Sequence, residues 1–385
     1  MKQMYARGLC ILLMVSVFVV GIFALCCQAM IKADDWTSYP ANRHIYTDGV
    51  LTAAGEITDR SGKVLAETVN GNRKYNSDYY TRISTLHAVG DFDGFIKTGL
   101  STSHWDDLTG YNRVTGLYSA KYGGNNIKMT ISADLNTVAL KALGGYSGAV
   151  GVYNYKTGEM LCMVSSPTYD PNGEVTADNG IYINRFLSSS YPPGSTFKLV
   201  TSIAALESGM DMQNRTYRCD RGVTVDNETI SCMAHHGDIG FRDALAKSCN
   251  AYFSQLSIDV GADQLQKCVN KLGFNSPCYI DGIKAKSSTI DLSNIRKVDL
   301  GWAGMGQYTD LVNPLHYLTL MGAIAGGGTA VEPYMIDSIT THDGIKIYSG
   351  GASHTSRMFT SETATTMVEM MRNNVSANYG DYRIP

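Results

Sequence analysis

Charged residues are scarce in this 385-residue sequence, and neither sign dominates. Lysine and arginine number 32 against 35 aspartates and glutamates, so charged residues make up 17% of the chain and the net charge is −3. A chain without a basic excess lacks the electrostatic footprint of nucleic-acid binding, and we expect no nucleic-acid partner. Internal repeats and low-complexity tracts are also missing. The length leaves room for two domains with an ample core.

A single long apolar run lies near the N-terminus. Residues 8–27 carry no charge and are long enough to span a bilayer as a helix. Lys2 and Arg7 precede the run, and positive residues favour the cytoplasmic side. We therefore predict that residues 1–31 form a cytoplasmic tail and a single-pass anchor in the cell membrane, with the rest of the chain extracytoplasmic. A cleaved signal peptide is the alternative, but Cys27-Gln28-Ala29 is a poor cleavage site.

The stretch Tyr191–Lys198 contains the first candidate catalytic residues. Its Pro-Pro-Gly segment cannot lie inside a helix, whereas the residues from Ser195 to Ser208 have a helical pattern that stops at Gly209. Ser195 and Lys198 are three residues apart, so their side chains emerge on the same side of the first turn. A buried lysine with a lowered pKa can deprotonate such a serine. The spacing predicts a serine nucleophile with a lysine base.

A second motif, Lys247-Ser248-Cys249-Asn250, follows downstream. It lies between helical patterns over residues 241–247 and 251–260, so Ser248 and Asn250 are expected at a helix–helix junction. There a hydroxyl can relay a proton and an amide can hydrogen-bond a peptide carbonyl. Ser-x-x-Lys followed by a Ser-x-Asn motif is the arrangement shared by penicillin-binding proteins and class A β-lactamases.

These motifs make the chain resemble the penicillin-binding proteins, specifically the monofunctional, membrane-anchored class B transpeptidases. Other segments share the resemblance: Tyr155–Leu161, Ser165–Pro171, His236-Gly237, Gly304–Gln307 and Asn313–Leu315. The resemblance implies an α+β fold, with helices around an antiparallel sheet, for a penicillin-binding/β-lactamase-like transpeptidase domain. It assigns residues 133–385 to this domain and residues 32–132 to a small β-rich pedestal.

The pedestal is expected to hold the active site away from the membrane and to offer a surface for partner proteins. Residues 54–66 should form a hairpin with its turn at Arg60-Ser61-Gly62. This piece is similar to the family's pedestal signature, although Ala54 stands where the family has arginine. The resemblance implies a glycosyltransferase and division or elongation proteins as partners.

Periodic patterns predict the other elements of the transpeptidase domain. A helix over 134–143 should precede strands over 149–155 and 160–165, and further helices are expected over residues 290–299, 315–325 and 361–373.

The resemblance implies a serine D,D-transpeptidase of peptidoglycan synthesis. Ser195 would attack the D-Ala-D-Ala amide of a stem peptide, and Lys198 would take its proton. Ser248 would pass that proton to the leaving amine, while Asn250 would hold the donor peptide. A second stem-peptide amine would then complete the cross-link, and β-lactams would acylate Ser195 as mimics of the donor. The family needs no cofactor or metal, and we expect none.

Three alternatives use the same residues differently. A D,D-carboxypeptidase would transfer the acyl group to water, and sequence does not separate it from a transpeptidase. A membrane-anchored scaffold of a cell-wall synthesis complex would perform no chemistry. A β-lactamase needs a carboxylate to activate water, and no glutamate occurs between Asn250 and Val331.

The family's third motif, Lys-Thr-Gly or Lys-Ser-Gly, does not occur after Asn250. Lys156-Thr157-Gly158 spells it, but it precedes Ser195 and is predicted to be the turn of a hairpin. In the family this motif supplies one N–H of the oxyanion hole, and loss of one such donor costs about 10²–10³ in rate. We therefore expect a chain truncated before the third motif, with C-terminal strands missing and activity impaired. It would be either a fragment or a natural truncation.

Six of the nine cysteines lie beyond the predicted anchor. Cys219 and Cys232 flank a turn-rich segment and could form a disulfide. Together with His235-His236 they could instead bind zinc, although the spacing differs from that of common zinc fingers. Cys268 and Cys278 are a weaker possible pair.

Overall fold

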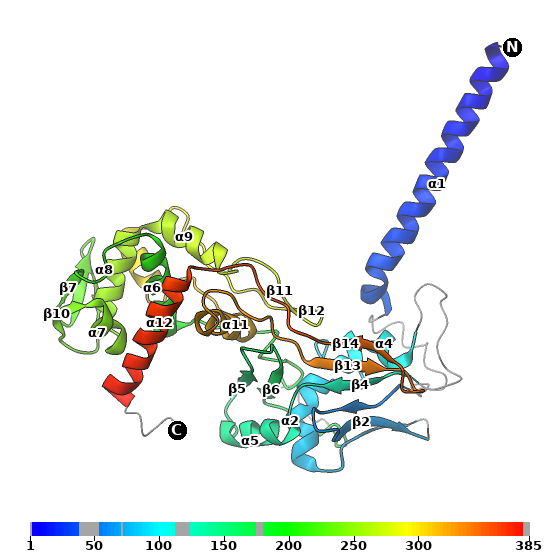
Figure 1. Cartoon of the computed structure of the whole chain (residues 1–385), viewed down its shortest axis with the longest axis horizontal. Helices are drawn as coiled ribbons and strands as arrows, with labels where there is room; N and C mark the ends of the chain where they lie inside the picture. Colours follow the sequence, from blue (N-terminus) through cyan, green and yellow to red (C-terminus); the bar gives the residue numbers. More distant parts are fainter. Residues whose placement is uncertain (1, 38–53, 71, 112–123, 175–179, 380–385) are drawn as a thin grey trace.

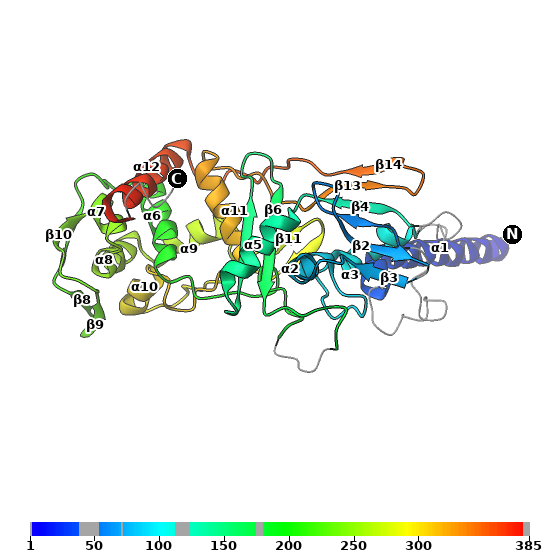
Figure 2. The same ribbon diagram turned by 90° about the horizontal axis from the view of Figure 1, so that it is seen from below.

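The computed structural model describes residues 2–37, 54–70, 72–111, 124–174 and 180–379. Beyond the N-terminal helix, Figure 1 shows a β-rich part and a helix-rich part around α6, with the strands β5 and β6 between them. The β-rich part contains a sheet of six strands. Figure 2 shows the same order from a second direction. The expected α+β fold, with helices, sheets and an N-terminal apolar helix, is confirmed.

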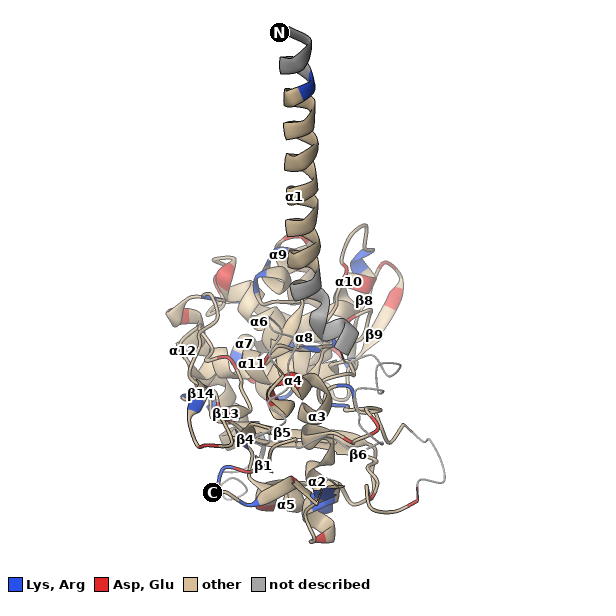
Figure 3. Cartoon of the chain, turned by 90° about the vertical axis from the view of Figure 1, so that its right-hand side faces the viewer, with Lys and Arg blue, Asp and Glu red and all other residues tan. Residues whose placement is uncertain are grey.

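The N-terminal helix α1 (Lys2–Thr37) contains the predicted anchor. Its segment Arg7–Gln28 has a mean hydropathy of 3.0 and no residue buried against the rest of the chain, and no other helix in the described ranges is long and apolar enough to cross a membrane. Arg7 is the only charged residue of this segment, and Figure 3 shows the helix projecting away from the rest of the described chain. The helix is a candidate membrane anchor, since an apolar surface of this length is otherwise exposed to water.

The six-stranded sheet combines strands from distant parts of the chain. Its order is β14-β13-β4-β1-β2-β3, and its neighbours are antiparallel except β1 and β4. Since β13 and β14 come from residues 336–349, the sheet joins strands from both predicted segments, 32–132 and 133–385. The strands are β1 (Ile57–Thr58), β2 (Val64–Val69), β3 (Asn72–Tyr75), β4 (Asn126–Met129), β13 (Ile336–Thr340) and β14 (Lys346–Ser349).

Asp59 closes the β1–β2 hairpin, whose turn lies where the sequence predicts it. Its Oδ1 accepts hydrogen bonds from Ser61 N (2.8 Å), Ser61 Oγ (2.6 Å) and Lys63 N (2.9 Å), and its Oδ2 accepts one from Ala133 N (3.0 Å). The carboxylate therefore ties the hairpin to the start of the helix α5. These hydrogen bonds hold the pKa of Asp59 below its usual value, against the opposing effect of burial.

Replacing Asp59 by alanine should destabilise the fold. The substitution leaves three backbone N–H groups, one of them buried, and one hydroxyl without their acceptor. Hydrogen bonds to a charged group contribute roughly 1.5–3 kcal/mol each. We expect Asp59→Ala to lower the free energy of unfolding by about 2 kcal/mol in a urea titration. Asp343→Ala, in the exposed β13–β14 turn, is the control and should change it by less than about 0.5 kcal/mol. Equal stability of the two variants would contradict this role for Asp59.

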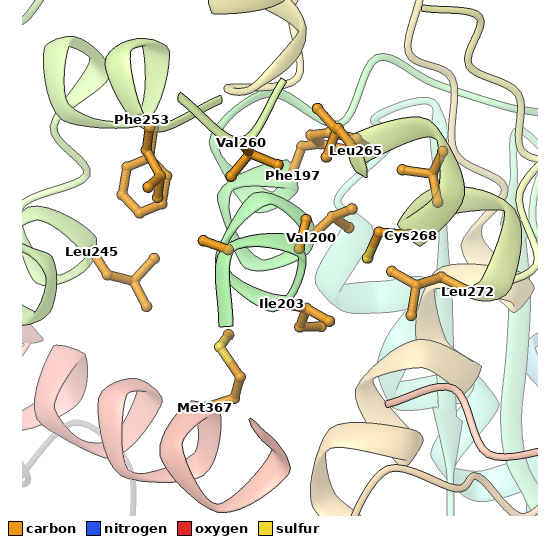
Figure 4. Close-up of a cluster of buried hydrophobic side chains, with 14 of the residues drawn as sticks. Phe197, Val200, Ile203, Leu245, Phe253, Val260, Leu265, Cys268, Leu272 and Met367 are labelled. Carbon is orange, nitrogen blue, oxygen red and sulfur yellow. The ribbon is translucent and has the colours of Figure 1, made fainter. Parts of the chain in front are cut away.

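The helix-rich part is built around α6, the helix that follows Ser195. Figure 4 shows side chains of Phe197, Val200 and Ile203 surrounded by apolar residues of neighbouring helices, among them Phe253 and Met367, and all five are fully buried. The helices are α6 (Lys198–Glu207), α7 (Phe241–Ala246), α8 (Asn250–Val260), α9 (Ala262–Lys271), α10 (Lys297–Ala303), α11 (Pro314–Ala325) and α12 (Ser361–Asn374). The helices predicted over 315–325 and 361–373 are confirmed, whereas the one predicted over 290–299 begins only at Lys297.

The strands β5 (Gly148–Tyr153) and β6 (Met160–Ser166) form an antiparallel pair. Both were predicted, as was the preceding helix α5 (Ala133–Leu143), which packs on β6 with α2 (Tyr79–Val89). Smaller elements complete the described chain: α3 (Leu100–Ser103), α4 (Trp105–Thr109), β7 (Thr216–Cys219), β8 (Gly222–Val225), β9 (Glu228–Ser231), β10 (Gly237–Gly240), β11 (Cys278–Ile280) and β12 (Ile283–Ala285). The pairs β7–β10 and β8–β9 lie beside α8 (Figures 1 and 2).

Candidate active site

Ser195 lies on a short 3-10 turn, Gly194–Phe197, that leads into α6. The N–H of Gly194 donates to Gly306 O at 2.9 Å, and a Cβ on Gly306 would lie only 2.3 Å from Gly194 O. Gly306, in the segment Gly304–Gln307, is therefore a glycine because the serine turn packs against its backbone. The hydroxyl of Tyr317 donates to Thr196 O at 2.5 Å and fixes the turn from α11. Ser195 itself is exposed to solvent.

Lys198 is buried, with 1% of its surface exposed, and its amine is the centre of the site. Nζ lies 3.2 Å from Ser195 Oγ, 2.8 Å from Ser248 Oγ and 2.7 Å from Ser248 O. It also donates to Asn250 Oδ1 at 2.7 Å. The structure thus brings the four predicted site residues together around one nitrogen.

Burial lowers the pKa of Lys198 to about 8, although the nearby thiols of Cys232 and Cys249 act in the opposite direction. No carboxylate is among its hydrogen-bond partners in the described chain, so desolvation of the ammonium is not offset by a full ion pair. A neutral amine is therefore accessible near neutral pH. This is the condition for accepting a proton from Ser195.

The second motif turns sharply between α7 and α8. Ser248 has φ 51°, a left-handed backbone that turns its hydroxyl and carbonyl toward Lys198. Asn250 is the first residue of α8, and its Nδ2 donates to Ser231 O at 3.0 Å. With Oδ1 on Lys198 and Nδ2 on Ser231, the Asn250 amide has a fixed orientation.

A cavity of about 350 Å³ opens beside Ser195. Its lining combines the serine turn, the second motif, the loop after β9 and the Gly304–Gln307 segment. The lining residues are Ser195, Cys232, Met233, Ala234, His236, Lys247, Ser248, Asn250, Met305 and Gln307. Ser195, Ser248 and Asn250 therefore lie together at the wall of this cavity, and the buried Lys198 amine that contacts all three lies behind them.

Lys156-Thr157-Gly158 lies in the turn between β5 and β6, as predicted. Gly158 has φ 84° and its N–H donates to Asn154 O at 2.8 Å, which closes the turn. Lys156 and Thr157 are exposed, and none of the three residues lines the cavity beside Ser195. The tripeptide is a hairpin turn and takes no part in this site.

One cluster beside the site was only partly foreseen. The ligand atoms of Cys219, Cys232, His236 and Cys249 all lie within 4.8 Å of one another. From the sequence, Cys219 and Cys232 were expected to form a disulfide or, with His235-His236, to bind zinc, and Cys249 was not part of that group. In the structure Cys249 joins the group, whereas His235 lies 3.1 Å from Asp220. All six cysteines beyond α1, Cys268 and Cys278 included, are free thiols.

A comparison with known families identifies the domain. Residues 148–384 match the family described as the penicillin binding protein transpeptidase domain. The chain belongs to the penicillin-binding protein transpeptidase family. The match covers the serine turn, the second motif and the Gly304–Gln307 segment, so the residues around Lys198 all lie inside the family domain.

Curated and solved relatives extend the similarity to almost the whole chain. A peptidoglycan D,D-transpeptidase, PbpA of Mycolicibacterium smegmatis, is 27% identical over 94% of this chain and 79% of its own length. The crystal structure of PBPA from Mycobacterium tuberculosis aligns with a TM-score of 0.74 and 25% identity, and covers 84% of this chain and 82% of that one. The same mycobacterial protein is known as an imipenem acyl-enzyme complex. The chain thus has the fold of a protein that β-lactams acylate.

Proposed function

We propose that this protein is a class B, membrane-anchored serine D,D-transpeptidase that cross-links peptidoglycan stem peptides through an acyl-Ser195 intermediate. One observation carries the proposal: Lys198 Nζ lies within 3.2 Å of Ser195 Oγ and of two groups of the second motif. The names of the relatives, which are D,D-transpeptidases, support the reaction type.

Acylation begins when neutral Lys198 takes the Ser195 proton. Oγ then attacks the carbonyl of the penultimate D-Ala, and the N–H of Ser195, at the start of a helical turn, faces the developing oxyanion. The proton passes from the Lys198 ammonium to Ser248 Oγ, 2.8 Å away, and from there to the leaving nitrogen of the terminal D-Ala. Asn250, fixed by Ser231, offers its amide to the donor peptide.

Deacylation repeats these steps in reverse with an amine as nucleophile. The amine of a second stem peptide loses its proton through Ser248 to Lys198 and attacks the acyl carbon, which restores Ser195 and forms the cross-link. A β-lactam follows the first half of this sequence only, because its leaving nitrogen stays tethered to the acyl group. β-Lactams and stem peptides ending in D-Ala-D-Ala are therefore the proposed ligands of the cavity.

The acceptor separates this proposal from a D,D-carboxypeptidase. Given a D-Ala-D-Ala stem peptide and an amine acceptor, the full chain in detergent should release one D-Ala for each cross-linked product, detected by mass spectrometry. Release of D-Ala with only the hydrolysed tetrapeptide would show a carboxypeptidase. Failure to release D-Ala or to take up a β-lactam would favour the non-catalytic scaffold.

Two finer points are part of the proposal. Lys2 and Arg7 support a cytoplasmic N-terminus, and the pedestal offers the surface for a glycosyltransferase and division or elongation proteins.

A further inference from the structure

We propose that Cys219, Cys232, His236 and Cys249 bind one Zn²⁺ ion, which holds the second motif in place beside Lys198. Three thiolates and one imidazole form a closed set of four ligands, the composition of structural zinc sites. Binding releases the three thiol protons to solvent, while His236 ligates as the neutral imidazole through Nδ1.

The distances fit a tetrahedral ion. Zn–S and Zn–N bonds of about 2.3 and 2.0 Å place tetrahedral ligand atoms about 3.5–3.8 Å apart. His236 Nδ1 lies 3.4 Å from Cys219 Sγ and 3.6 Å from Cys232 Sγ, and Cys232 Sγ lies 4.0 Å from Cys249 Sγ. These three separations, with all four atoms within 4.8 Å of one another, are close to the spacing that a tetrahedral Zn²⁺ ion requires.

Regular structure holds each ligand. Cys219 ends β7, and its carbonyl accepts from the N–H of His236, which directly precedes the paired strand β10. Cys232 follows β9, and its N–H donates to Arg221 O at 2.9 Å. Cys249 is fully buried as the N-cap of α8. Ligands on two strand pairs and one helix leave little freedom to lose when the metal binds.

A disulfide explains this cluster less well. Any one disulfide uses two of the three cysteines and leaves the third thiol and the imidazole without a role. The Cys232–Cys249 sulfur separation of 4.0 Å is also about twice the length of an S–S bond, so that pair must move to join. A zinc ion uses all four side chains as they stand.

The site connects directly to the catalytic residues. Cys249 lies between Ser248 and Asn250, and Cys232 adjoins Ser231, whose carbonyl fixes the Asn250 amide. A metal that joins Cys232 to Cys249 therefore fixes both residues that contact Lys198 from the second motif. The four ligands are positioning residues. Their effect on acylation rests on the proposed function, whereas metal binding does not.

Metal content provides the test. The full chain is purified in detergent with free Zn²⁺ on the order of 10 µM, enough to saturate a structural site, and is then desalted. Elemental mass spectrometry should then find about one zinc per chain. Co²⁺ added to the apo chain should give the intense absorption of thiolate-to-cobalt charge transfer. Cys219→Ser and His236→Ala should each lower Zn²⁺ affinity more than about 100-fold, the upper end of what loss of an outer-shell partner causes.

Matched controls are available at neighbouring positions. Cys268→Ser removes another buried cysteine and His235→Ala removes the adjacent histidine, and both variants should keep their zinc. His236 is only half-buried, so His236→Ala decides the question even if Cys219→Ser does not fold. Retention of zinc by His236→Ala, absence of zinc from the parent chain, or a disulfide between any two of the three cysteines in the intact mass would each overturn the proposal.

A combined experiment separates metal binding from catalysis. Ser195→Ala should bind zinc as the parent does, because Ser195 is not a ligand. Removing zinc from the parent should slow β-lactam acylation at least about 10-fold, and added Zn²⁺ should restore it. Zinc binding without acylation would refute the proposed function alone, and acylation without zinc binding would refute the metal site alone.

Discussion

Ser195→Ala should abolish the covalent adduct that a penicillin forms with this chain. Ser195 is exposed at the cavity wall with its Oγ 3.2 Å from the buried amine, and the proposed adduct requires a bond to that oxygen. In a serine hydrolase, loss of the nucleophile costs on the order of 10⁶ in rate. Intact-protein mass spectrometry after incubation with excess penicillin G should show one adduct per parent chain and none on the variant.

Ser188→Ala is a suitable control for this experiment. Ser188 is an exposed serine seven residues earlier, outside the cavity lining, so its replacement should leave the adduct unchanged. An adduct on Ser195→Ala at the parent rate would show that another residue is the nucleophile. A parent chain that forms no adduct even after prolonged incubation would contradict the proposal that it takes up β-lactams.

Lys198→Met should lower the acylation rate by about 10²–10⁴-fold, the usual contribution of a positioned general base. Methionine keeps most of the buried volume of the lysine stem but removes the amine that contacts Ser195, Ser248 and Asn250. The rate of penicillin acylation of the parent should also rise with pH and level off above about pH 8. This direction follows from the lowered pKa of Lys198, because only the neutral amine accepts the serine proton.

The variant's pH profile distinguishes a lost base from a disturbed fold. The slow acylation of Lys198→Met should no longer rise through pH 8, whereas a purely structural defect would keep that rise at reduced amplitude. Lys267→Met, on the exposed face of α9, should match the parent in both rate and profile. A Lys198→Met variant within about 10-fold of the parent would show that another group acts as base.

Local sequence patterns were enough to predict most elements near the site. Three of them depend only on residues that are close in sequence: the Pro-Pro-Gly segment before Ser195, the hairpin turn at Lys156-Thr157-Gly158 and the α7–α8 junction. The stiffness of proline, the flexibility of glycine and the spacing of apolar residues indicate these elements. The helix predicted over 290–299 was too long. Leu292 is buried and Leu292 N donates to Gln266 Oε1 on α9, so this segment pairs with a neighbour and becomes helical only at Lys297.

Contacts between distant residues could not be predicted in the same way. β13, more than 200 residues after β4, joins the six-stranded sheet by pairing with β4, and no local pattern encodes that choice. Cys249 meets Cys219, Cys232 and His236 only because β7, β9 and α8 pack together. The residue types of a metal site are visible in a sequence, but their convergence is not.

The sequence by itself predicted the candidate anchor, most of the α+β elements and the candidate site residues Ser195, Lys198, Ser248 and Asn250, since each of these depends on residues that are close together in the chain. The tertiary structure decided what those groups can do. It buries Lys198, which lowers its pKa to about 8, and it brings the second motif, fifty residues away, to within 2.8 Å of the amine. Desolvation and hydrogen-bond geometry arise only from packing, and they are the physical basis for the role of base that we propose for this lysine.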